Sequence, residues 1–130
     1  MTLEHITTDK APAAIGPYSQ AVRVGPWLYV SGQIALVPGT GELSGNSLPE
    51  QARQALRNLG EILAASGFAI TNVVSVDVFL TDITQFTAFN EIYAAFFGKH
   101  KPARAVVEVK GLPRSAQVEI KCVAYRRDVS

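Results

Sequence analysis

The chain has 130 residues, 48% of them hydrophobic and 18% charged, which is enough to bury a core in one domain and too few for two. We therefore expect a single domain over residues 1–130. A formal net charge of +1, with acidic and basic residues interspersed, leaves no basic stripe of the kind that binds nucleic acid or an anionic membrane.

No targeting or membrane segment is expected. Residues 1–5 lack a basic region followed by an apolar core, and no stretch approaches the roughly 20 apolar residues of a membrane span. These features predict a soluble, cytoplasmic protein.

The first elements in chain order are strands. Short runs rich in Val, Leu and Tyr predict paired strands over 18–24 and 27–34. Gly25-Pro26 between them predicts a turn, and a further strand fits residues 3–7.

A helix is predicted to follow a loop. Ser47, with Glu50 three residues later, forms the pattern of a capping box, so the helix should begin there. Gly67 predicts its end near Ser66. Apolar residues recur along it at three- and four-residue spacing and form one stripe. They are Ala52, Ala55, Leu56, Leu59, Ile62 and Leu63.

The next segments predict a strand and a second helix. Residues 73–80 alternate with a period of two, as in a strand with one buried face. One face would carry Val74, Val76, Val78 and Leu80. Thr84 can cap a second helix rich in aromatic residues, which Gly98 should end.

Two further strands, over 104–109 and 117–125, complete the chain. In the last strand the single cysteine, Cys122, alternates with apolar neighbours and is expected to be a core residue rather than a nucleophile. His5 and His100 have no spacing to other ligand residues that would make a metal site.

This order of elements predicts an α+β fold in which both helices pack on one face of a mixed sheet. The alternation places a partly apolar set of side chains on the other face. These are Phe79, Arg104, Val106, Glu119, Lys121, Val123 and Tyr125. An apolar face without a helix to cover it predicts burial against another subunit, so we expect a closed homo-oligomer with pockets where subunits meet.

Arg104 is the residue whose chemistry is most informative. Pro102 excludes a helix at this point, and an apolar strand then opens with a guanidinium, whose planar fork suits a carboxylate held by two hydrogen bonds. Two interpretations remain open from these residues. Arg104 binds an anionic ligand, or it is a strand residue paired with Glu108 or Glu119.

Four segments together resemble the Rid family, formerly called YjgF or liver perchloric-acid-soluble protein. They are Ala11–Ala21 (APAAIGPYSQA), Leu28–Ile34 (LYVSGQI), Pro102–Arg104 (PAR) and Val118–Ile120 (VEI). The resemblance runs nearly end to end. It implies a chorismate-mutase-like fold, a homotrimer with sites in the clefts between subunits, and hydrolysis of reactive enamines and imines. In the RidA branch the substrates are 2-aminoacrylate and related 2-imino acids, which become 2-oxo acids and ammonia.

The resemblance also implies roles for particular residues. Arg104 would hold the substrate carboxylate, and Glu119 would position or activate the water that attacks the imine carbon. Tyr18 would line the cleft and donate a hydrogen bond across the subunit boundary, while Ser31 would contribute a hydroxyl and Gly32 a backbone amide. A small 2-imino acid offers one anion and one electrophilic carbon, so an arginine and a carboxylate suffice, with no metal or cofactor.

Three positions qualify the resemblance. Many RidA members have a cysteine two residues after the arginine, whereas this chain has Val106, which can contribute only its backbone amide. An acidic residue often found after the glutamate is Lys121 here, which changes the charge near Glu119. Asn90, on the second helix, stands where the family often lines the cleft, and it can equally be a helix-surface residue.

Two other functions remain open. A non-catalytic module would bind a small carboxylate or a client protein, and would need Arg104 but not Glu119. The family label has also been attached to ribonuclease activity and inhibition of translation, which would require RNA binding by a chain with neither a basic stripe nor a ladder of stacking aromatic residues.

Overall fold

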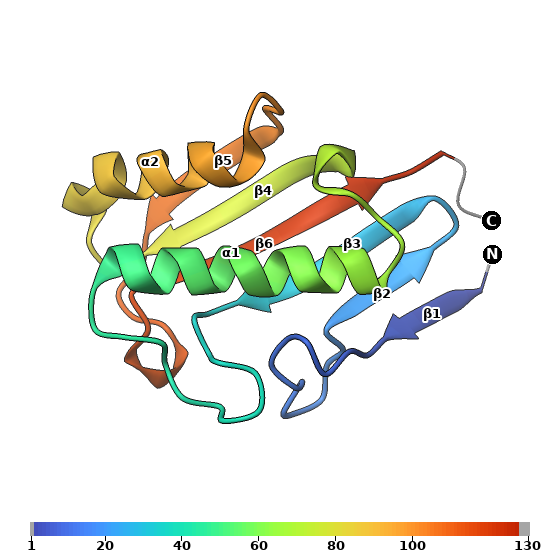
Figure 1. Cartoon of the computed structure of the whole chain (residues 1–130), viewed down its shortest axis with the longest axis horizontal. Coiled ribbons are helices and arrows are strands. Elements are labelled where there is room, and N and C mark those ends of the chain that lie inside the picture. The colour runs from blue at the N-terminus through green and yellow to red at the C-terminus, as the bar shows by residue number, and fades with distance from the viewer. Residues whose placement is uncertain (1, 128–130) are drawn as a thin grey trace.

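A computed structural model describes residues 2–127 and contains one six-stranded sheet with two α-helices (Figure 1). The strands are β1 (Leu3–Ile6), β2 (Ala21–Val24), β3 (Trp27–Gln33), β4 (Val73–Leu80), β5 (Ala103–Glu108) and β6 (Val118–Tyr125). The helices are α1 (Leu48–Ala65) and α2 (Phe86–Phe97). No helix in the part of the chain that the structure describes is long and apolar enough to cross a membrane.

The sheet is mixed, and both helices lie on the same side of it. Its strand order is β1-β2-β3-β6-β4-β5; β4 and β5 are parallel and all other neighbours are antiparallel. Figure 1 shows α1 and α2 in front of the sheet, with no helix behind it. The predicted α+β fold is confirmed.

Local sequence signals produce the first elements as predicted. Val24 pairs with Trp27 across a tight turn, in which Gly25 has a φ of 58°. At the start of α1 the Ser47 hydroxyl accepts a hydrogen bond from the backbone N–H of Glu50 and donates one to its carboxylate (3.3 and 2.9 Å). The predicted hairpin and helix cap are both present.

The start of α2 differs from the prediction. Thr84 does not cap this helix. It lies in a short 3-10 turn, η2 (Ile83–Gln85), whose cap is Asp82. The Asp82 carboxylate accepts hydrogen bonds from the backbone N–H of Thr84 (3.0 Å) and from its hydroxyl (2.6 Å), which lowers the pKa of Asp82. Asp82 and Thr84 are both residue types that favour the N-cap of a helix. Asp82 is ionised and is therefore the stronger acceptor of these hydrogen bonds.

The predicted face of β4 is wrong at one position. Val74 is exposed, and Val73 takes its place in the core. The cause is a shift in the pairing of β4 with β6 between Val73 and Ser75, because an extra residue in one strand reverses the sides of the residues before it. From Val76 onward the predicted alternation holds.

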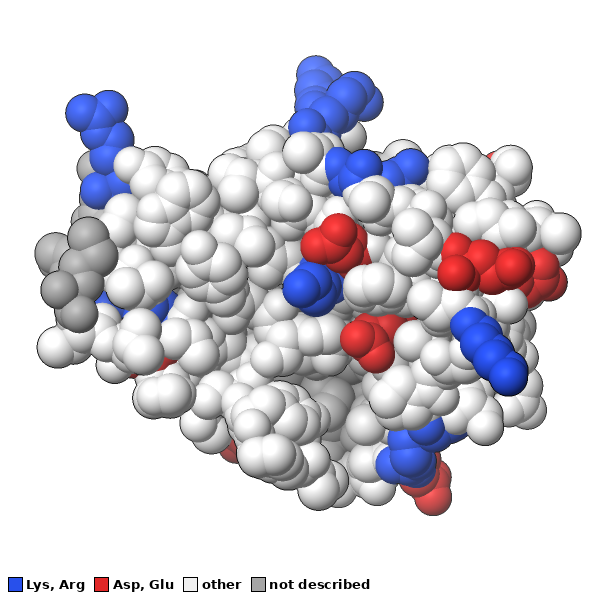
Figure 2. Space-filling view, turned by 180° about the vertical axis from the view of Figure 1, so that it is seen from behind, with Lys and Arg blue, Asp and Glu red and all other residues white. Residues whose placement is uncertain are grey.

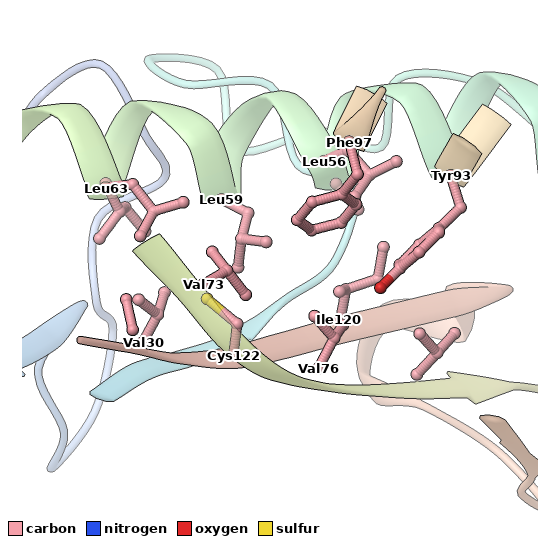
Figure 3. Packing of buried hydrophobic residues seen from close by; sticks show 14 of the residues in the cluster. Val30, Leu56, Leu59, Leu63, Val73, Val76, Tyr93, Phe97, Ile120 and Cys122 are labelled. Carbon is pink, nitrogen blue, oxygen red and sulfur yellow. The ribbon is translucent and has the colours of Figure 1, made fainter. Parts of the chain in front are cut away.

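The core lies between the helices and the sheet. Figure 3 shows leucines of α1 and aromatic rings of α2 above apolar strand residues. Every residue of the predicted α1 stripe is buried. Cys122 is also buried there, as predicted, and burial raises the pKa of its thiol to about 12.

The opposite face of the sheet has no layer above it. Figure 2 shows this face, on which charged side chains lie near the middle, along the upper edge and at the right of the view, with uncharged residues between them. Tyr29 is 51% exposed, Trp27 and Tyr125 lie edge to face beside it, and Val123 pairs with Tyr29 across the strands. The apolar uncovered face expected from the sequence is therefore present.

Candidate functional site

The structure places Arg104 and Val106 on the helix side of the sheet, not on the uncovered face as predicted. β5 pairs in parallel with β4, so that Arg104 lies beside Val76 and Val106 beside Val78. Val76 and Val78 both point into the core. The pairing register of β5 decides the side on which its residues lie, and alternation within β5 alone could not predict that register.

Arg104 belongs to a cluster with α2, which we call the Arg104 cluster (Phe86, Asn90, Tyr93 and Arg104). The guanidinium donates a hydrogen bond to Oδ1 of Asn90 (2.7 Å). Its central carbon lies 4.6 Å from the centroid of the Tyr93 ring and 5.6 Å from that of Phe86. Two aromatic faces and one amide thus hold a cation in a fixed orientation.

Within residues 2–127, Arg104 has no carboxylate partner. The ion pair that the structure contains there joins Arg23 to Glu4 (2.9 Å). Glu108 instead accepts a hydrogen bond from the backbone N–H of Ile83, and Glu119 points to the other face. Pairing of Arg104 with either glutamate is therefore excluded. The exposed guanidinium keeps donors for an anion, because one bond to Asn90 uses one of five.

Glu119 lies on the opposite face, in a cavity of about 290 Å³ that we call the Glu119 pocket. Glu119 pairs with Phe79, between two pairs of strand residues whose side chains face the helices. Because side chains alternate along a strand, the side chain of Glu119 lies on the other face. The residues around it come from the N-terminal loop, the end of β3 and the loop before β6. Those used below are Pro12, Tyr18, Gln20, Gly32, Arg114 and Glu119.

The carboxyl group of Glu119 is about half-buried, and burial raises its pKa above the usual range. The charge of Lys121 acts in the opposite direction but does not reverse the shift. A carboxyl whose pKa lies closer to neutrality can both accept and return a proton.

The lack of a side chain at Gly32 leaves the space that the carboxylate of Glu119 occupies. A Cβ atom at Gly32 would collide with Oε2 of Glu119 and lie 2.8 Å from its Cδ. Only glycine therefore lets the carboxylate lie against the backbone of β3. Gly32 and Glu119, which are far apart in the sequence, form one wall of the pocket.

Tyr18 and Ser31 have different surroundings. Tyr18 lines the pocket and is 54% exposed, and the structure gives its hydroxyl no hydrogen-bond partner among the described residues. The hydroxyl of Ser31 donates to the backbone carbonyl of Ser19 (2.5 Å), which commits its proton within the fold. Ser31 thus stabilises the chain segment that carries Tyr18, whereas the sequence analysis expected it to contribute a hydroxyl to the site.

Two pocket residues were given no role from the sequence. Gln20 lies inside the APAAIGPYSQA segment. It is buried, but it belongs to no helix or strand, so no periodic pattern in the sequence could indicate its burial. Arg114 has a left-handed backbone (φ 61°, ψ 22°), an uncommon conformation for a non-glycine residue, and no local signal predicts it. Gln20 comes from a loop and Arg114 from a three-residue 3-10 turn, and periodicity carries no information in segments of either kind.

The fold and the two groups of residues define a class of protein: a small α+β domain with an exposed arginine held against aromatic rings on one face of its sheet and a half-buried carboxyl in a pocket on the other. A family model described as Endoribonuclease L-PSP matches residues 8–126. The chain belongs to this family, the Rid or YjgF family, as the resemblance indicated.

Named relatives extend this assignment. The human 2-iminobutanoate/2-iminopropanoate deaminase is 50% identical over 121 residues, covering 93% of this chain and 88% of the relative. A RutC family protein of Pyrococcus horikoshii is 45% identical and covers 95% of this chain and 98% of its own. The crystal structure of E. coli TdcF with bound serine has a TM-score of 0.91 at 39% identity, covering 95% of this chain and 98% of that one.

Proposed function

We propose that the chain hydrolyses reactive 2-imino acids, such as 2-iminopropanoate and 2-iminobutanoate, to 2-oxo acids and ammonia. The name of the human relative supports this reaction class. The proposed assembly is a homotrimer, in which the Arg104 cluster of one copy faces the Glu119 pocket of the next. The substrate, a small anion, would bind between the two copies.

The observation that carries the proposal is that the Arg104 cluster and the Glu119 pocket lie on opposite faces of the sheet. We call each of them a half-site. Arg104 lies on the helix side of an edge strand and lacks a carboxylate partner, while Glu119 lies on the uncovered side with a raised pKa. Neither group completes a site alone. A second copy that covers the apolar face would bring the missing half-site to each of them.

The proposed chemistry uses each half-site once. Arg104 binds the substrate carboxylate by two hydrogen bonds, while Asn90 and the ring of Tyr93 keep the guanidinium in plane. This contact orients the imine carbon toward the Glu119 pocket. The exposed hydroxyl of Tyr18 and the backbone amides of Gly32 and Val106 are the remaining donors that we assign to substrate binding.

Glu119 would then transfer protons. Its carboxylate takes a proton from water as the water oxygen bonds to the imine carbon, and it returns this proton to the imine nitrogen to give a carbinolamine. Glu119 then takes the hydroxyl proton of the carbinolamine and passes it to the amine nitrogen as the C–N bond breaks, which releases ammonia and forms the carbonyl of the 2-oxo acid. A carboxyl with a raised pKa suits both directions of transfer, a contribution of about 10²–10⁴-fold.

The first test is ammonia and pyruvate release from 2-aminoacrylate generated in situ by a serine dehydratase. We expect the wild-type chain to accelerate release and Arg104→Ala to lower this acceleration by about a hundredfold. Arg57→Ala removes an exposed arginine from α1 and is the matched control. Equal acceleration by Arg104→Ala and wild type would contradict the proposal, provided that circular dichroism shows both to be folded.

A second test addresses the shared site. An Arg104→Ala chain still carries Glu119, and a Glu119→Gln chain still carries Arg104. Co-expressed in equal amounts, they should regain about a quarter of wild-type activity if each site joins residues of two copies. No recovery in purified mixed oligomers would show that both residues act within one copy or not at all.

A non-catalytic carboxylate-binding protein is the second candidate, because the E. coli relative was crystallised with serine. Binding of serine or 2-oxobutanoate that survives Glu119→Gln, while hydrolysis is lost, supports the hydrolase. Binding without any hydrolysis by the wild type supports the binder. The endoribonuclease named in the family description receives less support, because the face in Figure 2 carries no basic stripe along its described residues.

A further inference from the structure

Gln20 is a buried polar residue beside the Glu119 pocket, with only 3% of its surface exposed. Its side-chain carbonyl accepts a hydrogen bond from the backbone N–H of Thr8 (2.7 Å). Its amide donates to the backbone carbonyls of Thr8 (3.0 Å), Ala11 (3.4 Å) and Pro12 (2.7 Å). Residues 8–12 belong to no strand or helix, so their backbone groups lack the hydrogen bonds that a strand or helix would provide. The side chain of Gln20 supplies hydrogen bonds to them instead.

The segment that Gln20 holds is one wall of the pocket. Pro12 lines the cavity, as do Gly32 and Glu119, which together form a second wall. Gln20 is itself anchored to that second wall, since its backbone carbonyl accepts a hydrogen bond from the N–H of Ser31 (2.9 Å), the residue before Gly32. A connected path of hydrogen bonds therefore links the two walls through Gln20.

We propose that Gln20 is a positioning residue that sets the width of the Glu119 pocket and so selects 2-imino acids with short side chains. This inference rests on the proposed function, because it assigns the pocket to the substrate side chain and reacting carbon. Gln20 acts through the backbone of Pro12. Loss of its amide would leave the carbonyls of Ala11 and Pro12 without their donor and let this wall move outward.

The test replaces Gln20 with Met, which has a similar length but no amide, and with Glu, which keeps the acceptor for Thr8 N–H but loses the donors. Gln54→Met is the control, because Gln54 bonds to Asn58 on α1, away from residues 8–12. Hydrogen exchange of residues 8–13, followed by mass spectrometry, reports the wall directly. We expect faster exchange in both Gln20 variants and not in the control.

Selectivity is measured as the ratio of kcat/KM for 2-iminopropanoate to that for the imine derived from leucine. We expect this ratio to fall by about tenfold in Gln20→Met, because misplacement of the wall penalises the small substrate more than the large one. Unchanged exchange in both Gln20 variants would overturn the inference. Faster exchange with an unchanged ratio would also overturn it, since Gln20 would then be structural only.

The two proposals fail separately. If the wild type hydrolyses no imine, the proposed function fails, and the same ratio is measured from the dissociation constants of pyruvate and 4-methyl-2-oxopentanoate. A tenfold fall in that ratio would still support Gln20 as the residue that sets the pocket width. An unchanged ratio would overturn that role as well.

Discussion

A single carboxyl group, that of Glu119, carries much of the chemistry that we propose for this protein. Glu119 occupies a strand position that points away from the core, yet the cavity around it removes enough water to raise its pKa. Its neighbour Lys121 weakens this effect without cancelling it. The combination leaves a glutamate that changes protonation closer to neutral pH than an exposed one does.

Stability should respond to this group in a defined pH window. Glu119 holds its proton more tightly in the folded chain than in the unfolded chain, so the folded state loses stability as pH rises from about 4.5 through the raised pKa. Glu119→Gln removes this loss. We expect the urea midpoint of Glu119→Gln relative to wild type to rise across that window and to be flat below it. Midpoints that move in parallel at all pH values would contradict the raised pKa.

Gly32 provides a test of the pocket wall. In Gly32→Ala the new methyl group would collide with the carboxylate of Glu119 and displace it. We expect imine hydrolysis to fall by about a hundredfold with little loss of folding, measured by kcat/KM and by thermal unfolding. Gly111→Ala, where an added Cβ meets nothing within 4 Å, is the control. Full activity in Gly32→Ala would show that Glu119 need not lie against β3.

At this scale the sequence singled out the two residues of the proposed site, but it placed Arg104 on the wrong face of the sheet. Arg104 and Glu119 were both singled out by their chemistry and by the family motifs, and both were assigned to one face of the sheet. Their opposite sides follow from the register between β4 and β5, which depends on two strands at once. Gln20 was missed because a buried polar side chain in a loop gives no periodic signal.

Among the secondary-structure elements, α1 connects the core to the pocket. Its stripe of leucines and alanines packs on the sheet, but two polar residues of the same helix are equally buried. One of them, Asn58, donates hydrogen bonds to the backbone carbonyls of Ile34 (3.2 Å) and Leu36 (2.9 Å). Ile34 and Leu36 line the Glu119 pocket, so α1 also supports the site.

Replacement of Asn58 should therefore be costly. In Asn58→Leu the carbonyls of Ile34 and Leu36 lose their donor, and we expect the free energy of unfolding to fall by about 1–3 kcal/mol. Arg57→Leu, at the adjacent exposed position, should change it by less than about 0.5 kcal/mol. Urea unfolding of both variants checks this. Equal losses in the two would mean that Asn58 contributes only helix propensity.

The elements themselves were largely predictable. The cap at Ser47, the apolar stripe and Gly67 act within one or two turns, and they define α1 to within a residue. The start of α2 was misplaced because Asp82 caps a 3-10 turn by accepting from the backbone N–H of Thr84, so that Thr84 lies inside this turn instead of capping α2. Val74 was misplaced because a register shift in β4 has no signature in β4 alone.

For the whole molecule, the uncovered face indicates where another copy would bind. It is apolar around Tyr29 and Val123 and lies on the side of the sheet that holds the Glu119 pocket. A partner that covers this face would also close the pocket. Assembly and activity are therefore expected to depend on the same surface.

A negative charge introduced on the uncovered face of the sheet should weaken the association between copies of the chain. We expect Val123→Asp to shift the protein from oligomer to monomer in size-exclusion chromatography with light scattering, because an unpaired carboxylate would be buried. Ala64→Asp, on the exposed side of α1, adds the same charge away from both the uncovered face and the Arg104 cluster and should have no effect. An intact oligomer in Val123→Asp would contradict the choice of interface.

The burial of Cys122 has a consequence for chemical durability. It is the single cysteine of the chain, it lies beneath α1 and α2, and its pKa of about 12 keeps it almost wholly protonated at neutral pH. A protonated, shielded thiol is a poor target for electrophiles, oxidants and disulfide exchange. We expect iodoacetamide to leave the native chain unmodified and to alkylate it only in urea, as intact mass would show. If the chain hydrolyses reactive imines, as we propose, it would thus keep its one thiol out of their reach.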